Sequence, residues 1–420
     1  MSIPPRIRAG MVGLGMIFDE TYRPFFEQVH REGLFRRDFG LVDVDLAAVA
    51  TRTGTRAGKY RAHAPTPFAN LTGPDAAEQL AKSDVDVVCV ATPDDRHFGP
   101  AKAALTAGKH VLIEKPSVLS LAELDELQAL ADEKQVLAKV VYHKLLDPDH
   151  KKLRTHVLEG NLRHVNNGYC SLLEPKSIST GQFAEWLTGR NPGTYVACHY
   201  TKLIDFTFFS RGNYALTRIS ANGQRGLVGP ADGNTWDSTQ LQVTYTHLND
   251  GREATFDIHT SWVTPDNFPG YVDQEVQFRF DNGVWNAHQR KRGVEVTIED
   301  RSPGEFKYTP NHHYNGRFVE PWNELSQRGY GIEVIRRFFE EVAYVEHGPG
   351  DRHDRWQAMA HYKYNDLSAE RNCVAIVQAL EAILAEHAAG RPGGMVTTDD
   401  GLRLYLPGVA EPKVLYAGRV

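Results

Sequence analysis

The stretch His110-Val111-Leu112-Ile113-Glu114-Lys115-Pro116 decides the fold. It is a short apolar run with β-branched residues, which indicates a buried parallel strand. Pro116 has no N–H for the ladder and keeps the residue before it out of helical geometry, so the strand ends there. Glu114 and Lys115 therefore lie at the carboxyl end of a strand, where open α/β sheets bind ligands. A lysine there can hold a substrate hydroxyl; the alternative is an exposed ion pair that caps the strand.

The segments before this strand indicate a strand–helix–strand crossover. Val87–Pro93 is a second apolar run, and Asp94, Asp95, Arg96 and His97 follow it. A short helix is predicted before this run, at Leu71–Ala81. Residues 99–108 are rich in alanine and predict a helix between the two strands. Such a unit belongs to a parallel sheet, and its second strand carries Lys115.

Length and composition bound the class of protein. A chain of 420 residues predicts two domains. A net charge of −6 without a long basic block argues against nucleic acid as a partner. The four cysteines lack CxxC spacing, so neither a zinc site nor a disulfide framework is predicted. No apolar stretch approaches a membrane span or a signal peptide, and we expect a cytoplasmic protein without a membrane partner.

A partial dinucleotide fingerprint opens the chain. The strand predicted at Ile7–Val12 leads into Gly13-Leu14-Gly15-Met16-Ile17-Phe18. One glycine allows the tight turn and the other lets the backbone approach a pyrophosphate at a helix N-terminus. The third position is Phe18, where glycine or alanine would allow close packing. A helix is predicted from about Met16 to His30, with Pro24 as an interruption. The predicted cofactor contacts of this turn are Gly13, Gly15, Met16 and Ile17.

The end of the second strand, Val44–Ala50, bears on the choice of cofactor. NAD sites carry an acid there for the ribose 2′-hydroxyl, whereas an arginine accommodates the 2′-phosphate of NADP. This chain has Thr51-Arg52-Thr53. We interpret Arg52 as a 2′-phosphate ligand, assisted by Thr51 or Thr53, which predicts NADP. The alternative is a solvated arginine in an enzyme that uses NAD.

Four motifs together resemble a known family. They are the Gly13–Gly15 turn, Thr92-Pro93 with His97, Gly108-Lys109-His110 and Glu114-Lys115-Pro116, in the expected order and spacing. The chain is similar to the Gfo/Idh/MocA family of nicotinamide-dependent oxidoreductases, which act mostly on sugars, cyclitols and their derivatives. The resemblance is strong over residues 5–160 and thinner to about 392. It implies further cofactor contacts at Thr92, Pro93, His97, Glu114 and Lys115.

The resemblance also implies the architecture. We expect an N-terminal Rossmann domain (1–145), then an α/β domain with a large, open, mostly antiparallel sheet for substrate binding and oligomerisation (146–392), and a C-terminal extension (393–420) with no assigned structure. Two later helices are predicted, at Gly331–Val345 and Leu367–His387. Strands are predicted at Arg163–Leu173, Leu216–Gly223, Gln240–Leu248, Glu253–Ser261, Glu275–Asp281 and Val294–Glu299. An open sheet face commonly pairs with another copy, which predicts a homodimer or homotetramer.

The family implies the roles of two site segments. The lysine of its Glu-Lys-Pro motif lies beside the nicotinamide and contacts the reacting hydroxyl, which assigns that role to Lys115. A second element usually reads Asp-x-x-x-His-x-x-Asp, with the histidine as general acid/base. The matching stretch here is Cys198-His199-Tyr200-Thr201-Lys202-Leu203-Ile204-Asp205. Cys198 stands in place of the first aspartate and Lys202 in place of the histidine.

Several groups remain candidates for the acid/base. Lys202 can serve if burial and Lys115 depress its pKa, or it can bind substrate oxygens only. His199 lies at i and i+3 with Lys202 if the segment is helical, and it is the next candidate. Asp205 orients one of these groups or faces a polar core. Two further substrate-binding residues, Tyr142 and His143, can reach this region from a strand end.

Other polar clusters predict no metal site. His312 and His313 are adjacent and lack the spacing of a helical metal pair. A polar loop that lines the substrate cleft, together with Tyr314, is the better interpretation. Trp186, Trp236, Trp262 and Trp285 are predicted mainly as core residues.

The leading hypothesis is an NAD(P)-dependent oxidoreductase that moves a hydride between a nicotinamide and a hydroxyl or carbonyl carbon of a sugar, glycoside or cyclitol. One alternative is redox-assisted glycoside cleavage with a tightly bound cofactor that is reduced and reoxidised in each turnover. Another is a non-catalytic regulator that binds NADP.

Overall fold

A computed structural model describes residues 3–179, 187–210, 213–266, 268, 272–289, 311–360 and 364–420. The chain forms two compact units. The first unit comprises Met1–Leu146 and His312–Glu370, and the second comprises Asp147–Asn311 and Arg371–Val420. Each is described by itself. The division into domains at residues 145 and 392 stays a prediction.

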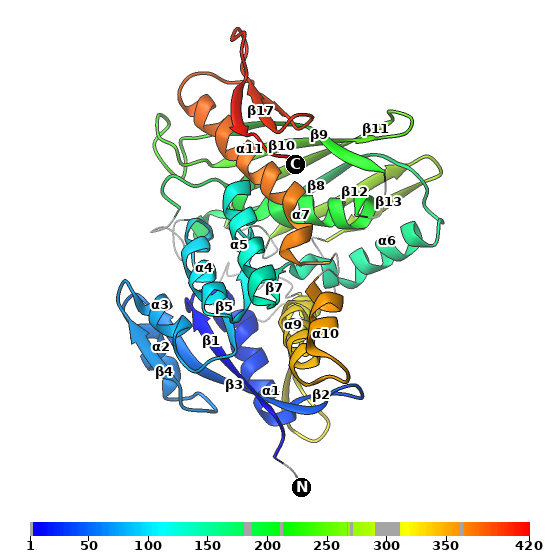
Figure 1. The fold of residues 1–420 in the computed structure, drawn as a ribbon. Helices are drawn as coiled ribbons and strands as arrows, with labels where there is room; N and C mark the ends of the chain where they lie inside the picture. The colour runs from blue at the N-terminus through cyan, green and yellow to red at the C-terminus, as the bar shows by residue number, and fades with distance from the viewer. Residues whose placement is uncertain are drawn as a thin grey trace. The chain divides into compact units, whose positions relative to one another are not determined.

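The first unit is built on a mainly parallel sheet (Figure 1). Its strand order is β2-β3-β1-β5-β6-β7, and β4 pairs with β3. All pairs except the antiparallel β2–β3 are parallel. The strands are β1 Arg6–Val12, β2 Leu34–Arg36, β3 Gly40–Thr51, β4 Ala69–Thr72, β5 Val87–Val90, β6 His110–Glu114 and β7 Ala138–Val141. The predicted Rossmann-like N-terminal domain is confirmed.

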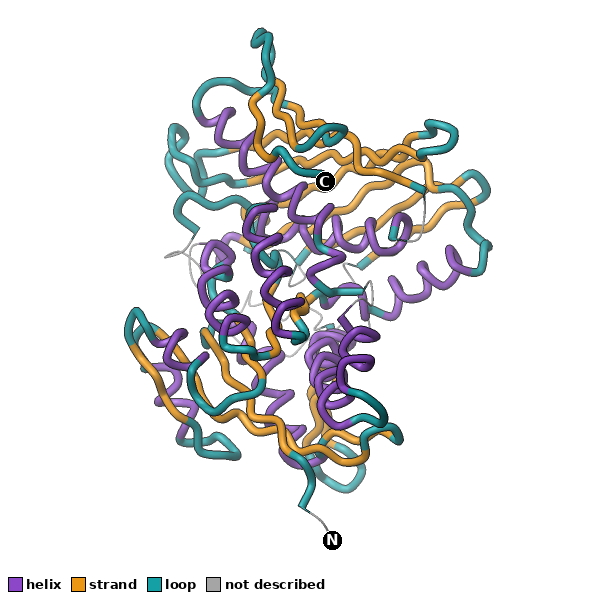
Figure 2. Tube along the Cα trace, viewed as in Figure 1, coloured by secondary structure: helices purple, strands orange, loops and turns teal. Residues whose placement is uncertain are grey.

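The helices of the first unit cover this sheet in two groups (Figure 2). In one group α3, α4 and α5 contact one another, and in the other α1 contacts α9. Every residue of β5, β6 and β7 is buried, as expected for central parallel strands. The helices are α1 Arg23–Glu32, α2 Thr55–Arg61, α3 Ala76–Ala81, α4 Phe98–Thr106, α5 Leu121–Lys134, α8 His312–Asn315, α9 Tyr330–His347 and α10 Arg352–Ala360.

The structure refines two local predictions in this unit. The helix predicted from Met16 to His30 extends to Glu32, and it is irregular next to Pro24, because a π-helical turn, Phe18–Tyr22, directly precedes α1, in which Pro24 is the second residue. Leu71–Ala81 is not one helix: β4 ends at Thr72, and the helical part begins only at Ala76, after Gly73-Pro74.

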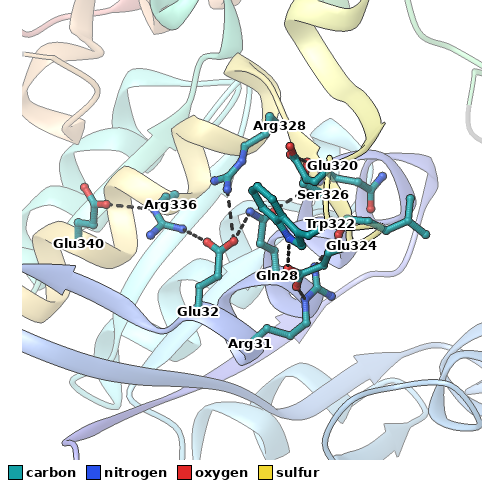
Figure 3. A network of polar contacts seen from close by, with 12 residues as sticks. Gln28, Arg31, Glu32, Glu320, Trp322, Glu324, Ser326, Arg328, Arg336 and Glu340 are labelled. Carbon is teal, nitrogen blue, oxygen red and sulfur yellow. Dashed lines mark hydrogen bonds and ion pairs between the residues drawn. The ribbon is translucent and has the colours of Figure 1, made fainter.

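The hairpin of β14 (Gly316–Val319) and β15 (Leu325–Arg328) is anchored on α1 and α9 by a polar network (Figure 3). Glu32 of α1 forms ion pairs with Arg328, at 3.3 Å, and with Arg336 of α9, at 3.7 Å. The side-chain oxygen of Gln28 accepts a hydrogen bond from the backbone N–H of Gln327 at 3.3 Å. These bonds fix the chain that directly follows α8.

The second unit contains a nine-stranded sheet with the order β13-β12-β8-β11-β10-β9-β16-β17-β18. β8 and β11 are parallel, and the other described pairs are antiparallel. The strands are β8 Val165–Pro175, β9 Tyr214–Gln224, β10 Ser238–His247, β11 Glu253–Thr264, β12 Asp273–Phe280, β13 Gly283–His288, β16 Met395–Thr397, β17 Leu402–Tyr405 and β18 Lys413–Tyr416. The predicted large, mostly antiparallel sheet is confirmed.

The C-terminal extension completes this sheet. β16 pairs with β9, and β17 and β18 continue the order to its edge. At the other edge the chain turns at residues 281–283 from β12 into β13. The strand predicted at 294–299 and Trp186 lie outside the described residues.

One face of this sheet is covered by helices (Figure 1). A continuous helical run comprises a π-helical turn at Gly193–Ala197, α7 at Cys198–Ile204 and a second π-helical turn at Asp205–Phe209. α11, Arg371–Ala388, packs on β9 and contacts α7. Helix α6, Pro148–Leu158, contacts the run through its second π-helical turn. Burial alternates along β11, which is typical of a sheet with one covered face.

Candidate active site

The turn after β1 has the geometry of a dinucleotide-binding turn. Gly13 has φ +90°, and a Cβ there would lie 2.4 Å from the carbonyl oxygen of Ala91. Its N–H donates to the carbonyl oxygen of Ala50 at 3.0 Å. Only glycine therefore fits this position, between the ends of β3 and β5. A Cβ at Gly15 would meet nothing within 4 Å, so a ligand can approach the backbone there. The two glycines fit a pyrophosphate.

Phe18, at the third fingerprint position, is buried and packs edge-to-face on Tyr60 of α2, with ring centroids 5.2 Å apart. The side chain that departs from the fingerprint therefore contributes to the core. Met16 and Ile17 are half-buried in the turn before it. Their contact with a cofactor stays a prediction.

The end of β3 presents Arg52 and Thr53 to solvent. The Thr51 hydroxyl accepts a hydrogen bond from the N–H of Gly54 at 3.0 Å and so shapes the turn. Arg56, one helical turn further, pairs with Asp19. The arginine that we expect to bind a 2′-phosphate thus lies at the strand end where the dinucleotide ribose is bound in Rossmann folds.

His97 joins the loops that follow β5 and β6. Its Nδ1 lies 2.7 Å from the carbonyl oxygen of Pro116, and its Nε2 lies 2.9 Å from that of Thr92. Burial lowers the pKa of the imidazole, so the neutral ring donates to one of the two oxygens. This geometry gives His97 a positioning role. Its contact with a cofactor, like those of Thr92 and Pro93, stays a prediction.

The pair at the end of β6 is not an exposed ion pair. Glu114 is 6% exposed and Lys115 is 9% exposed. The hydroxyl of Tyr22 donates to the Glu114 carboxylate at 3.1 Å. Burial raises the pKa of Glu114 to about 7, against the opposing effect of Lys115. A buried lysine at this sheet edge is a functional-site candidate.

The segment after β7 brings His143 to Lys115. Burial, followed by the charges of Lys115 and Lys144, lowers the pKa of His143 to about 3. The imidazole is therefore neutral near pH 7. The hydroxyl of Tyr142 donates to Glu370 at 2.7 Å, so this buried tyrosine is directed at Glu370. Substrate binding by Tyr142 stays a prediction.

Glu20 and Tyr314 are two further polar groups near this site: Tyr314 was expected in a polar loop that lines the substrate cleft, and it lies instead on the short helix α8. Glu20, in the π-helical turn, forms a hydrogen bond with Tyr314 of α8. Burial raises the pKa of Glu20 to about 7. The Tyr314 ring lies edge-on to His143, with centroids 5.4 Å apart. The cluster of His312, His313 and Tyr314 was the available signal in the sequence, whereas nothing distinguished Glu20.

The second unit holds Lys202 and Asp205 in a buried polar cluster. Lys202 is 1% exposed. Asp205 accepts hydrogen bonds from the side-chain amide of Asn372 at 2.7 Å and from the hydroxyl of Tyr245 at 3.4 Å. Burial raises the pKa of Asp205, and the charge of Lys202 opposes the shift. Asp205 therefore faces a polar core that β10, α7 and α11 build together, and the sequence did not reveal Tyr245 or Asn372.

The two residues of α7 that differ from the expected motif, Cys198 and Lys202, each have a defined neighbour. The Cys198 thiol donates to the carbonyl oxygen of Tyr195 at 3.4 Å, within its own helical run. His199 is half-buried one turn before Lys202 on the same helix, as predicted. Lys202 has Asp205 as a charged neighbour where the family has an aspartate–histidine pair.

The described part of the chain offers neither a metal-binding cluster nor a membrane-spanning helix. Within the described ranges, no cluster of three or more His, Cys, Asp or Glu side chains is arranged to hold a metal ion. Among the helices that the structure describes, none has the length and apolar character needed to cross a membrane.

Comparison with known proteins identifies the first unit. Residues 7–142 match the model of the oxidoreductase family Gfo/Idh/MocA, NAD-binding Rossmann fold. The uncharacterized oxidoreductase YdgJ of Escherichia coli is 30% identical over 160 residues, 38% of this chain and 41% of that protein. The scyllo-inositol 2-dehydrogenase (NADP(+)) IolW of Bacillus subtilis is 35% identical over 82 residues, 20% of this chain and 23% of that protein. The chain thus spans less than half the length of these two relatives.

The fold extends further than the sequence likeness. The crystal structure of scyllo-inositol dehydrogenase from Lactobacillus casei, with bound NAD(H) and scyllo-inositol, superposes with a TM-score of 0.62. The alignment covers 93% of this chain and 99% of that one at 11% identity, which supports the fold alone. The family match over residues 7–142, with the glycine turn and the Glu114-Lys115-Pro116 motif in place, shows that the N-terminal domain is that of the Gfo/Idh/MocA oxidoreductase family.

Proposed function

We propose that the protein is an NAD(P)-dependent oxidoreductase that transfers a hydride between the nicotinamide and a hydroxyl or carbonyl carbon of a sugar, glycoside or cyclitol. The observation that carries this proposal is Lys115, 9% exposed at the carboxyl end of β6 and next to the neutral imidazole of His143. An ammonium with little exposure and a neutral neighbour suits a substrate hydroxyl better than a solvent-exposed ion pair does.

The substrate class is supported by the named relatives. IolW is a scyllo-inositol 2-dehydrogenase, and the Lactobacillus casei structure contains scyllo-inositol. This cyclitol presents neighbouring hydroxyl groups, which buried lysines and polar side chains can bind. A small polyhydroxylated substrate is therefore the first class to test.

The residues have distinct proposed roles. When bound, the nicotinamide supplies the carbon that accepts or returns the hydride. Lys115 holds the reacting oxygen by hydrogen bonding. Lys202 acts as the acid/base or binds further substrate oxygens, and His199 is the other acid/base candidate. His143 binds substrate beside Lys115, and Asp205 orients Lys202.

NADP is the proposed cofactor, because Arg52 follows β3 where NAD sites carry an acid. The label NADP(+) in the name of IolW is in keeping with this choice. NAD is the alternative, and the NAD(H) in the Lactobacillus casei structure supports it.

The test is a fluorescence titration of the purified chain with NADPH and with NADH, followed by a turnover screen. The screen uses scyllo-inositol, myo-inositol, glucose and methyl glucoside with NADP⁺ and NAD⁺. Tight NADPH binding and reduction of NADP⁺ by one of these compounds is the expected result. Release of methanol from methyl glucoside without net cofactor reduction would instead indicate redox-assisted cleavage. Cofactor binding without any turnover would contradict the proposed activity.

A further inference from the structure

We propose that Tyr314 and Glu20 form the proton path of the hydride-transfer site, in which the Tyr314 hydroxyl meets the reacting oxygen and Glu20 takes the proton. The inference rests on the proposed function and deepens it. It uses only residues of the first unit. Tyr314 would be the catalytic residue and Glu20 the terminal proton acceptor.

Two glycines make room for Tyr314. Gly329 has φ +144°, and a Cβ there would lie 2.2 Å from the carbonyl oxygen of Tyr314. A Cβ at Gly331 would lie 2.5 Å from Cε2 of the Tyr314 ring. Neither site accepts a larger residue without movement of α8. The close approach of residues 329–331 to this tyrosine fixes both its backbone and its ring.

The turn that carries Glu20 holds Tyr314 from the other side. The side-chain amide of Asn315 donates to the backbone carbonyl of Glu20 at 2.5 Å, and the Glu20 carboxyl is hydrogen-bonded to Tyr314. The hairpin that follows α8 is anchored on α1 through Glu32 (Figure 3). A tyrosine on a four-residue helix is thus held by three separate elements, which is the support that a positioned catalytic group needs.

The Tyr314 phenol also interacts with a neighbour of each of the two residues at the end of β6, Glu114 and Lys115. On one side its ring packs edge-on against His143, at 5.4 Å and 79°, and His143 senses the charge of Lys115. On the other side Tyr314 acts electrostatically on Tyr22, which donates to Glu114. Tyr314 therefore lies in the same cluster as Glu114 and Lys115, at the carboxyl end of β6.

The proposed step balances as follows for oxidation. When bound, the oxidised nicotinamide would supply the acceptor for the hydride that leaves the substrate carbon. The substrate O–H proton moves to the Tyr314 oxygen while the Tyr314 proton moves to the Glu20 carboxylate. The products are a carbonyl compound, an unchanged phenol and a protonated Glu20, which returns its proton to water. Reduction runs in reverse.

The electrostatics of Glu20 suit this exchange. Burial raises its pKa to about 7, the Tyr314 hydrogen bond opposes the shift, and the neighbouring Asp19 adds to it. Asp19 is itself paired with Arg23 at 3.7 Å and with Arg56. The other charged groups of the cluster are Glu114, behind Tyr22, and Lys115 and Lys144 around His143. A carboxyl that titrates near neutrality can accept and return a proton at the working pH.

The direction of the pH effect follows from the protonation state. Oxidation needs ionised Glu20, so its rate is expected to rise with pH through about 7. Reduction needs protonated Glu20, so its rate should fall over the same range. Removal of either Tyr314 or Glu20 should eliminate this change of rate with pH near 7, which is one limb of the pH–rate profile.

The experiment compares pH–rate profiles of oxidation for the full chain, Tyr314→Phe and Glu20→Gln, using the best substrate of the panel above. Matched controls are Tyr344→Phe on α9 and Glu27→Gln on α1. We expect Tyr314→Phe to lose about 100-fold in kcat. Glu20→Gln, which is nearly isosteric, should lose the limb near pH 7 while its NADPH affinity stays within about threefold, a loss smaller than one modest contact. Both controls should keep the wild-type profile.

A second readout does not depend on turnover. Ultraviolet difference spectra between pH 6 and 8 should show a tyrosine absorption change that is smaller in both site variants than in the wild type and both controls; the remaining change comes from Tyr22, which donates to Glu114. Tyr314→Phe with kcat within about threefold of wild type and an unchanged limb would overturn the proton path and leave the proposed function intact. Failure of the wild type to oxidise any compound of the panel would overturn both, whatever the spectra show.

Discussion

The two polar sites of the chain differ in how each buries a lysine beside a carboxylate. In the first unit Lys115 adjoins Glu114, whose pKa burial raises to about 7 and which has one tyrosine donor at 3.1 Å. In the second unit Lys202 lies near Asp205, which accepts hydrogen bonds at 2.7 Å and 3.4 Å from two neutral donors. Both carboxylates are buried and burial raises the pKa of both, but Asp205 accepts from two neutral side-chain donors whereas Glu114 accepts from one.

This difference suggests a division of work between the sites. The hydrogen bonds from Asn372 and Tyr245 favour the ionised form of Asp205 against the effect of burial, and a carboxylate near Lys202 suits that lysine to hydrogen-bond donation rather than to proton transfer. The strand-end site instead combines two carboxyl groups with pKa values near 7 and a neutral imidazole. Proton exchange near neutral pH is therefore expected in the first unit and charge-assisted binding in the second.

The largest expected effect is that of Lys115→Ala. Loss of the buried ammonium should reduce hydride transfer by about 10³-fold or more, since the reacting oxygen loses its donor, while NADPH affinity stays within about tenfold. Stopped-flow measurement of nicotinamide absorbance gives the rate of hydride transfer, and a fluorescence titration gives the NADPH affinity. Lys134→Ala, on the exposed end of α5, is the control. Near wild-type transfer by Lys115→Ala would remove the proposed mechanism.

The next largest expected effect is on the free energy of unfolding, which depends on pH through the protonation of Glu114. Its folded pKa of about 7 exceeds the ordinary value of 4.5, so the folded state binds the extra proton between these values. Its contribution to the free energy of unfolding is fully present below pH 4.5 and is lost as the pH rises to about 7, by up to about 3 kcal/mol.

Glu114→Gln keeps the oxygen that accepts from Tyr22 and removes the titration. Urea unfolding at pH 5, 6 and 7.5 should therefore show a gain for this variant over wild type that grows with pH. Glu126→Gln, an exposed carboxylate of α5 paired with Lys102, is the control. A wild-type-to-variant difference that is constant with pH would contradict the raised pKa.

Local signals explain how much of this could be predicted. Pro116 marks the end of a buried strand, so the position of Glu114 and Lys115 followed from one heptapeptide. The glycine turn and the alternation of the second sheet are equally local. The residues that hydrogen-bond to the site carboxylates cannot be found from such local signals. Tyr22 is 92 residues from Glu114, and Asn372 is 167 residues from Asp205. No periodicity or spacing connects such groups.

The structure of the C-terminal extension could not be predicted, for another reason. Its strands β16, β17 and β18 have three or four residues each. Runs of that length show no reliable alternation, and their pairing with β9 is a tertiary feature. Likewise, the predicted helix over 71–81 merged β4 and α3, because a four-residue strand leaves almost no pattern.

A smaller effect is expected for Lys202→Met. If Lys202 is held protonated by Asp205, this variant should raise KM for the substrate about tenfold, the value of one charged hydrogen bond of about 1.4 kcal/mol. The shape of the kcat profile with pH should stay that of the wild type. Steady-state kinetics from pH 6 to 9 provide the test. Loss of a limb of the profile would instead make Lys202 the acid/base, and the same loss in His199→Gln would assign that role to His199.

The smallest expected effect is that of Arg52→Ala, and it tests the first unit by binding alone. Arg52 lies exposed at the end of β3, where solvent screens its charge, so one phosphate contact should contribute only about 1.4 kcal/mol. NADPH affinity should fall about tenfold while NADH affinity stays within about twofold, since NADH lacks the 2′-phosphate. Fluorescence titrations at low and at physiological salt measure both, and the difference should shrink at the higher salt. Arg61→Ala on α2 is the control, because its guanidinium donates to the carbonyl oxygen of Phe68. Equal weakening of both cofactors by Arg52→Ala would show that the residue supports the turn after β3 and does not select NADP.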